Sequence, residues 1–282
     1  MTFEKMNKKE ILICTKLHSA IEERNLEKTM FLLKSGADVN SKNKLNLAPI
    51  HFAVWTGDLR FLKILVVHGA DLDAKDLYGY TALHLAVLNN DVEAVKCLIS
   101  NGASISLADN SRKTPLQYAF ESNSLEIFSC LIKQASQETK DKFIIKAAEL
   151  NQISVIEILL KNQANVEARL NIDMTCLNKL ILAIGPQLAT EVVSKSCLSW
   201  ALEKNSVELA KLLMSYGADI DFKDPNGQSL LHISVIRSSS EFVQILIKAG
   251  ASLNSKNEDG NKPIETALSC NLELFKLISF NE

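Results

Sequence analysis

The chain has 282 residues, a length that accommodates one large domain or two. Hydrophobic residues make up 47% and charged residues 23%, so the chain can build a core and is not generically disordered. The formal net charge of -2 provides no overall field for nucleic acid or an anionic membrane, and an aromatic content of 6% argues against base-stacking surfaces. We therefore expect an ordered, mostly aliphatic protein that binds no nucleic acid.

Residues 1–15 are expected to form an N-terminal extension without the apolar segment of a secretory signal. The longest apolar runs, such as residues 180–184, are far shorter than the roughly 20 residues that cross a bilayer. The six cysteines show no CxxC pair, so we interpret them as small buried hydrophobic residues rather than metal ligands or disulfides. These features predict a cytoplasmic protein without membrane insertion.

A repeated glycine divides the rest of the chain. Gly36, Gly69 and Gly102 lie 33 residues apart, each followed by alanine, and Gly217 and Gly250 keep the same interval. A constant period between about 20 and 50 residues predicts a stacked array of small units. Extending the register predicts nine helical pairs, at residues 16–40, 47–73, 80–106, 112–138, 141–168, 173–194, 196–221, 229–254 and 262–280.

The third unit shows how each pair is encoded. Thr81 can cap a first helix through its hydroxyl, and the apolar residues after it share one helical face. A second apolar stripe covers residues 92–99, and Gly102 is suited to the left-handed position that ends a helix. Helices of about 8–10 residues are unstable alone in water, so stability must come from stacking against neighbouring copies.

These motifs closely resemble the ankyrin repeat family. Residues 81–84 (TALH), 114–116 (TPL) and 230–232 (LLH) match its Thr-Pro-Leu-His signature, and residues 36–40 (GADVN) match its closing motif. The resemblance implies an all-α solenoid of about nine helix-turn-helix units joined by short β-hairpin-like loops. It also implies a non-enzymatic protein that binds protein partners on a concave surface of loop tips and first helices.

The match is uneven along the chain. Gln163 replaces the closing glycine of the fifth pair, and Gly185-Pro186 interrupts the sixth, which is shortened. We predict an N-terminal stack at 16–168, a degenerate repeat at 169–195, and a C-terminal stack with a terminal cap at 196–282.

Candidate catalytic and metal-binding residues have a structural explanation. Four of the five histidines, His18, His51, His84 and His232, occupy one slot of the repeat, where the resemblance implies hydrogen bonds between neighbouring loops. Cys97 and Cys130 are expected to be buried and inert. The acidic loops lack the glutamate that completes an EF-hand. We predict no catalytic residue, no metal site and no cofactor.

A partner-binding surface is predicted on the second, third and fourth repeats, where aromatic and apolar residues fall in slots that the family exposes. Trp55, Tyr78 and Tyr80 are suited to anchor a partner, because large rigid side chains bury much area with few rotatable bonds. The alternative is that Trp55 and one tyrosine only cover adjacent loops. The predicted contact residues are Lys44, Leu45, Leu47, Trp55, Leu77, Tyr78, Tyr80, Lys113 and Glu121. The matching slots of the eighth and ninth repeats are more polar, so we expect them to contribute less to partner binding.

The leading hypothesis is a monomeric interaction scaffold with an unidentified protein partner. A second hypothesis is an ankyrin-type effector that an intracellular bacterium delivers into the host cytosol by specialised export. A third is an enzyme of unfamiliar type at the irregular segment 169–200, which a polar pocket with a perturbed histidine, cysteine or aspartate would favour.

Overall fold

The computed structural model describes residues 16–166 and 196–281, and these form helices and turns. Within the described ranges there are sixteen helices and no strand, only an isolated bridge between Lys223 and Ser229. The chain divides into two compact units, residues 1–135 and 136–282. The all-α class is therefore confirmed, whereas the predicted limits of the stacks and of the degenerate repeat stay a prediction.

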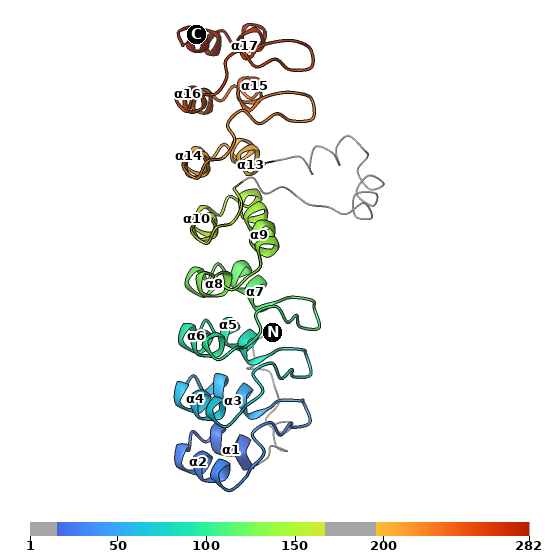
Figure 1. Cartoon of the computed structure of the whole chain (residues 1–282), viewed down its shortest axis with the longest axis vertical. Coiled ribbons are helices and arrows are strands. Elements are labelled where there is room, and N and C mark those ends of the chain that lie inside the picture. Colours follow the sequence, from blue (N-terminus) through green and yellow to red (C-terminus); the bar gives the residue numbers. More distant parts are fainter. Residues whose placement is uncertain (1–15, 167–195, 282) are drawn as a thin grey trace. The chain divides into compact units, whose positions relative to one another are not determined.

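The first unit consists of four antiparallel helical pairs. In Figure 1 its first helices lie between the second helices and a row of projecting loops. Each helix packs against its partner within the pair and against the equivalent helix of the next pair, so the apolar stripes cover one another. The pairs are α1 (Lys16–Glu22) with α2 (Leu26–Lys34), α3 (Pro49–Thr56) with α4 (Leu59–Val67), α5 (Ala82–Leu88) with α6 (Val92–Ser100), and α7 (Pro115–Glu121) with α8 (Leu125–Ile132).

The second unit repeats this arrangement in its described part. There α9 packs against α13 and α10 contacts α14, so the predicted fifth and seventh pairs are direct neighbours. The predicted sixth pair, 173–194, lies outside the described residues. The pairs are α9 (Gln137–Glu149) with α10 (Ile153–Lys161), α13 (Cys197–Glu203) with α14 (Val207–Ser215), α15 (Leu230–Ile236) with α16 (Ser240–Lys248), and α17 (Pro263–Cys270) with α18 (Leu272–Ser279).

Helix starts follow the capping residues of the sequence. The Thr81 hydroxyl accepts a hydrogen bond from the backbone N–H of His84, and Ser229 does the same for His232. The predicted start of the fifth pair at residue 141 is wrong, because α9 already begins at Gln137. Ser136 caps it there by accepting from the Thr139 N–H at 3.3 Å, which adds a turn to the helix.

The repeated histidines connect neighbouring repeats, as the resemblance implied. The Nε2 atom of His84 donates to the Lys113 carbonyl at 3.1 Å, and that of His232 donates to the Asn261 carbonyl at 2.9 Å. Their Nδ1 atoms accept from the backbone N–H of the helix cap, which assigns the neutral Nε2–H tautomer. Each ring therefore closes its own helix cap and holds the loop of the next repeat.

Burial follows the helical stripes, with fully buried phenylalanines at Phe61, Phe120, Phe128 and Phe242. Each such side chain contributes on the order of 2–3 kcal/mol through burial. The expectation that the cysteines are buried is only partly right. Cys197 is buried, but Cys97 and Cys130 are half-buried and Cys270 is exposed, because they lie at the edges of their helical stripes.

Candidate protein-binding site

Three loops of the first unit share one internal architecture. A side-chain oxygen near the start of each loop accepts two backbone N–H groups and closes a five-residue turn. The Asp76 carboxylate accepts from residues 78 and 80, both at 2.8 Å, and the Asp109 carboxylate accepts from residues 111 and 113 at 2.8 and 2.9 Å. Asn43 does the same in the loop before them. The side-chain oxygens of these three residues point into the turns, and the tips of the loops point outward.

The three tips are joined to one another by backbone hydrogen bonds. The Leu77 N–H donates to the Leu45 carbonyl at 3.0 Å, and the Asn110 N–H donates to the Tyr78 carbonyl at 3.0 Å. The Asn110 side chain adds a bond to the Leu77 carbonyl. Residues 43–47, 76–80 and 109–113 therefore form one continuous surface, which we call the loop-tip surface.

The apolar centre of the loop-tip surface lies on its middle loop. Leu77 and Tyr78 are 52% and 55% exposed and lie next to each other at the tip of this loop. Lys44 is exposed and Leu45 is half-buried on the preceding loop. The expectation that Leu47 is exposed is wrong. It is buried, and its backbone is held on both sides, the N–H by the Asn43 side chain and the carbonyl by His18 Nε2 at 3.0 Å.

Trp55 is less available than the sequence suggested. Its indole is half-buried and packs edge-on against Phe52, with ring centroids 5.1 Å apart. This arrangement agrees with the alternative in which Trp55 mainly covers its neighbours. The exposed tyrosine of this surface is Tyr78.

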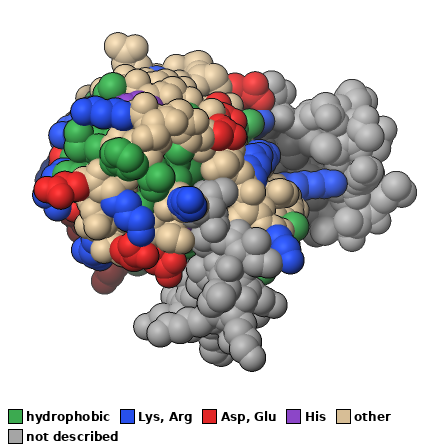
Figure 2. Space-filling view, turned by 90° about the horizontal axis from the view of Figure 1, so that it is seen from below, with side chains coloured by type: hydrophobic (Ala, Val, Ile, Leu, Met, Phe, Trp, Pro, Cys, Tyr) green, Lys and Arg blue, Asp and Glu red, His purple; other side chains and the backbone are tan. Residues whose placement is uncertain are grey.

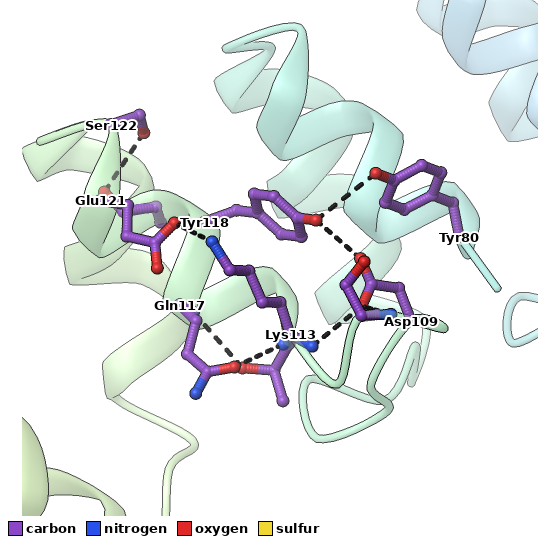
Figure 3. A network of polar contacts seen from close by, with 10 residues as sticks. Tyr80, Asp109, Lys113, Gln117, Tyr118, Glu121 and Ser122 are labelled. Carbon is purple, nitrogen blue, oxygen red and sulfur yellow. Dashed lines mark hydrogen bonds and ion pairs between the residues drawn. The ribbon is translucent and has the colours of Figure 1, made fainter. Parts of the chain in front are cut away.

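Behind the loop tips lies a polar network that spans two repeats (Figure 3). The Tyr118 hydroxyl donates to Asp109 at 2.6 Å and lies 3.4 Å from the Tyr80 hydroxyl. The rings of Tyr80 and Tyr118 meet edge-on, and each lies against His84. Tyr80 is therefore a half-buried structural link between the loop and the helices, rather than an exposed anchor.

Electrostatics reinforce this network. Burial, together with the hydrogen bond to Asp109, raises the pKa of Tyr118, so its hydroxyl remains a donor. Burial alone would raise the pKa of Asp109, but the hydrogen bonds from Tyr118 and from backbone N–H groups outweigh it and lower that pKa. A charged carboxylate with a fixed donor set makes the third loop rigid.

Lys113 and Glu121 form an ion pair at the side of the network, with 2.6 Å between Nζ and the carboxylate (Figure 3). The Lys113 ammonium also lies 5.5 Å from the centre of the Tyr118 ring. Next to them a shallow pocket opens between the ends of α5 and α7, lined in part by Leu88, Tyr118 and Glu121. Glu121 thus lines a hollow that a partner side chain can enter, and its ion pair with Lys113 lies beside that hollow.

The sequence analysis did not identify Asp109 and Tyr118, which organise the site. The regular spacing of Asn43, Asp76 and Asp109, 33 residues apart, is the signal that identifies the loop acceptors. The second unit contains a pocket that its polar slots did not lead us to expect. This pocket has an apolar floor that includes Phe222 and Ile236.

Gly79 is expected to be one of the least replaceable residues of the surface. Its φ of +82° strains any L-residue, and an added Cβ would lie 2.7 Å from the Asn110 backbone nitrogen. Gly79→Ala should lower the free energy of unfolding by about 2–3 kcal/mol in urea denaturation, since about 1–2 kcal/mol is strain and the rest is the clash. Gly260→Ala, with φ +80° and open space, is the control, and an equal loss in both would contradict this account.

Nothing in the described part of the chain points to a metal centre, because no three potential metal ligands gather there. No helix among the described residues is long and apolar enough to cross a membrane. Figure 2, seen from the α1–α2 end of the first unit, shows acidic, basic and hydrophobic side chains interspersed. That mixture agrees with the near-neutral net charge of the chain.

Comparison of the sequence with known protein families assigns the chain to a class with this kind of fold. The sequence profile described as "Ankyrin repeats (3 copies)" matches residues 17–109, 83–170 and 198–281, which together span most of the chain. The chain therefore belongs to the ankyrin repeat family. Repeats of this family are generally protein–protein interaction modules.

Individual relatives match shorter stretches. The chain is 34% identical to mouse protein phosphatase 1 regulatory subunit 27 over 84 residues, 29% of this chain and 54% of that protein. It is 35% identical to putative ankyrin repeat protein L271 of Acanthamoeba polyphaga mimivirus over 74 residues, 26% of this chain and 10% of that protein. The match to fowlpox virus FPV034 is 24% identical over 131 residues, 42% of this chain and 30% of that protein. The chain thus spans about half or less of these relatives.

Proposed function

We propose that the chain is a non-enzymatic scaffold that binds a protein partner through the loop-tip surface and the adjoining pocket. The observation that carries this proposal is the exposed pair Leu77 and Tyr78. Asp76 closes the loop that holds them, and a hydrogen bond from Asn110 joins this loop to the next one, which Asp109 closes. Rigid aromatic and apolar side chains lose little entropy when they are covered, so they favour binding. The regulatory-subunit name of the mouse relative supports an interaction role.

Capture experiments with a double variant test this proposal. Leu77→Ser/Tyr78→Ser removes two exposed apolar side chains without touching the core, so the protein should fold normally. The wild-type chain should capture its partners from its native cell. The double variant should recover at least tenfold less of them, because anchor residues are each worth about 1–2 kcal/mol. The matched control is Val67→Ser on α4, which removes an exposed apolar side chain elsewhere (82% exposed). Undiminished capture by the folded double variant would contradict the proposal.

The finer hypotheses of a bacterial effector, a monomeric state and a cytoplasmic location stay predictions. A translocation reporter fused to the chain distinguishes an exported effector from a protein that remains in its own cell. Light scattering of the purified chain measures its oligomeric state.

A further inference from the structure

Cations without a counter-ion flank the apolar centre of the loop-tip surface. Lys42 and Lys44 precede it on the first loop and Arg112 follows it on the third, and all three are exposed. Among the described residues, no acidic side chain pairs with them, whereas Lys113 of the same surface is neutralised by Glu121.

The acidic residues of the same loops do not balance this charge at the surface. Asp76 and Asp109 are each only 6% exposed, because their carboxylates accept the backbone N–H groups inside the turns. A ligand that approaches the tips therefore meets positive charge on both sides of Leu77 and Tyr78, with the compensating carboxylates beneath the surface.

Arg112 occupies its position at a conformational cost. Its φ is +63°, and the equivalent residues of three other loops are the glycines at 79, 227 and 260. An L-residue in this region costs about 1–2 kcal/mol, so a bulky arginine there needs a reason. Arg24, also at positive φ, donates to the Thr56 carbonyl, but Arg112 makes no such bond in the described structure. Its exposed guanidinium is free to contact a ligand.

Of the two corresponding loop tips described in the second unit, one is uncharged, with Pro225 and Asn226, and the other carries the opposite charge. Glu258 and Asp259 fill the two tip positions that Leu77 and Tyr78 fill in the first unit, and both are exposed. Lys44 and Arg112 therefore have no cationic counterpart in these loops of the second unit, whereas Lys42 has equivalents there in Lys223 and Lys256.

We infer that the loop-tip surface binds an extended acidic segment of a partner protein, in which acidic residues flank an apolar side chain. This inference rests on the proposed function and specifies its ligand. The apolar side chain covers Leu77 and Tyr78, and the acidic residues face Lys44 on one side and Arg112 on the other. Repeats about 10 Å apart place those cations roughly 20 Å apart, the length of about six extended residues.

Peptide display on the full chain tests the inference. A random library of short peptides is selected on the wild-type chain, on Lys44→Glu/Arg112→Glu and on Lys34→Glu/Lys63→Glu. The last variant makes the same charge change at exposed positions on α2 and α4. We expect wild-type and control chains to enrich peptides with Asp or Glu around an apolar residue. The loop variant should bind those peptides at least tenfold more weakly, and their binding to wild type should weaken as salt rises.

Arg112→Gly provides a variant in which misfolding cannot explain the loss. Relief of the positive φ should raise the thermal midpoint of unfolding, while removal of the guanidinium should weaken acidic-peptide binding severalfold. Unchanged peptide binding by this variant would overturn the inference.

The remaining outcomes separate the two proposals. Peptides that lose binding to Leu77→Ser/Tyr78→Ser but show no acidic preference would overturn the inference and leave the proposed function intact. No enrichment over that double variant would overturn both. A single-stranded oligonucleotide that binds more tightly than the peptides, with the same dependence on Lys44 and Arg112, would also overturn the inference.

Discussion

Acidification from about pH 6.5 to about pH 5.5 should destabilise the first unit by up to about 3 kcal/mol, because an unfolded histidine is only half protonated at the start of this window. Burial lowers the pKa of His18, His51 and His84 below the 6.5 of an unfolded chain. In that window the unfolded state binds protons that the folded state does not, so stability present above pH 6.5 is lost as the pH falls. Each such histidine contributes up to about 1.4 kcal/mol per pH unit.

The two tryptophans allow each unit to be followed separately. Trp55 lies in the first unit and Trp200 in the second, so Trp200→Phe and Trp55→Phe leave a fluorophore in one unit at a time. Urea unfolding across the pH range should show a steeper acid dependence for the first unit. It holds three buried histidines, while the described part of the second holds only His232, whose pKa burial also lowers.

Glutamine substitution is the matched test of this mechanism. In the fourth repeat Gln117 occupies the histidine slot, and its side-chain oxygen accepts the Thr114 N–H at 2.8 Å without a titrating group. The triple variant His18→Gln/His51→Gln/His84→Gln should therefore flatten the acid dependence of the first unit, while His68→Gln, at an exposed site, should not. If the unfolding free energy of the first unit fell equally with pH in the wild type and in the triple variant, the buried histidines would not be its cause.

Asp109→Ala should cost the first unit about 3 kcal/mol and also disable the loop-tip surface. The carboxylate accepts the Tyr118 hydroxyl and the backbone N–H groups of Ser111 and Lys113, and bonds to a charged acceptor are worth about 1.5–3 kcal/mol. Without it the third loop loses the turn that presents Arg112. Urea unfolding followed through Trp55, and hydrogen exchange of the amides at 111 and 113, measure the two consequences.

Asp109→Asn separates the geometry of this acceptor from its charge. Asn43 already performs the same task in the first loop, accepting the N–H groups of residues 45 and 47 at 2.9 Å each. The asparagine variant should therefore lose no more than about 1 kcal/mol and retain binding. If the alanine and asparagine variants behaved alike, the Asp109 turn would not be what supports the surface.

Local patterns were sufficient for the helices and their caps. The Thr81 cap and the left-handed Gly102 are set by residues a few positions away, and both appear where the sequence analysis placed them, as do the histidines of the repeated slot. The start of α9 was predicted wrongly because the fifth unit lacks the loop and signature that mark the others, and Ser136 supplies an earlier cap.

The candidate site was predicted less completely. Exposure of Leu77 and Tyr78 followed from their slots, but Leu47 is buried, and Trp55 is half-buried against Phe52 of its own helix. Asp109 and Tyr118 were not recognised because their roles depend on a hydrogen bond between a loop and the helix that follows it.

By itself, the sequence determined the class of this protein. Its apolar stripes, glycines and capping residues act within a few residues of one another, so each repeat encodes a short helical pair, and such short helices are stable only when the pairs stack. Only the tertiary structure decided which loop side chains face outward, because hydrogen bonds between residues 29 to 33 positions apart set that direction. Those contacts join the loops into one surface, on which Leu77, Tyr78, Lys44 and Arg112 are exposed.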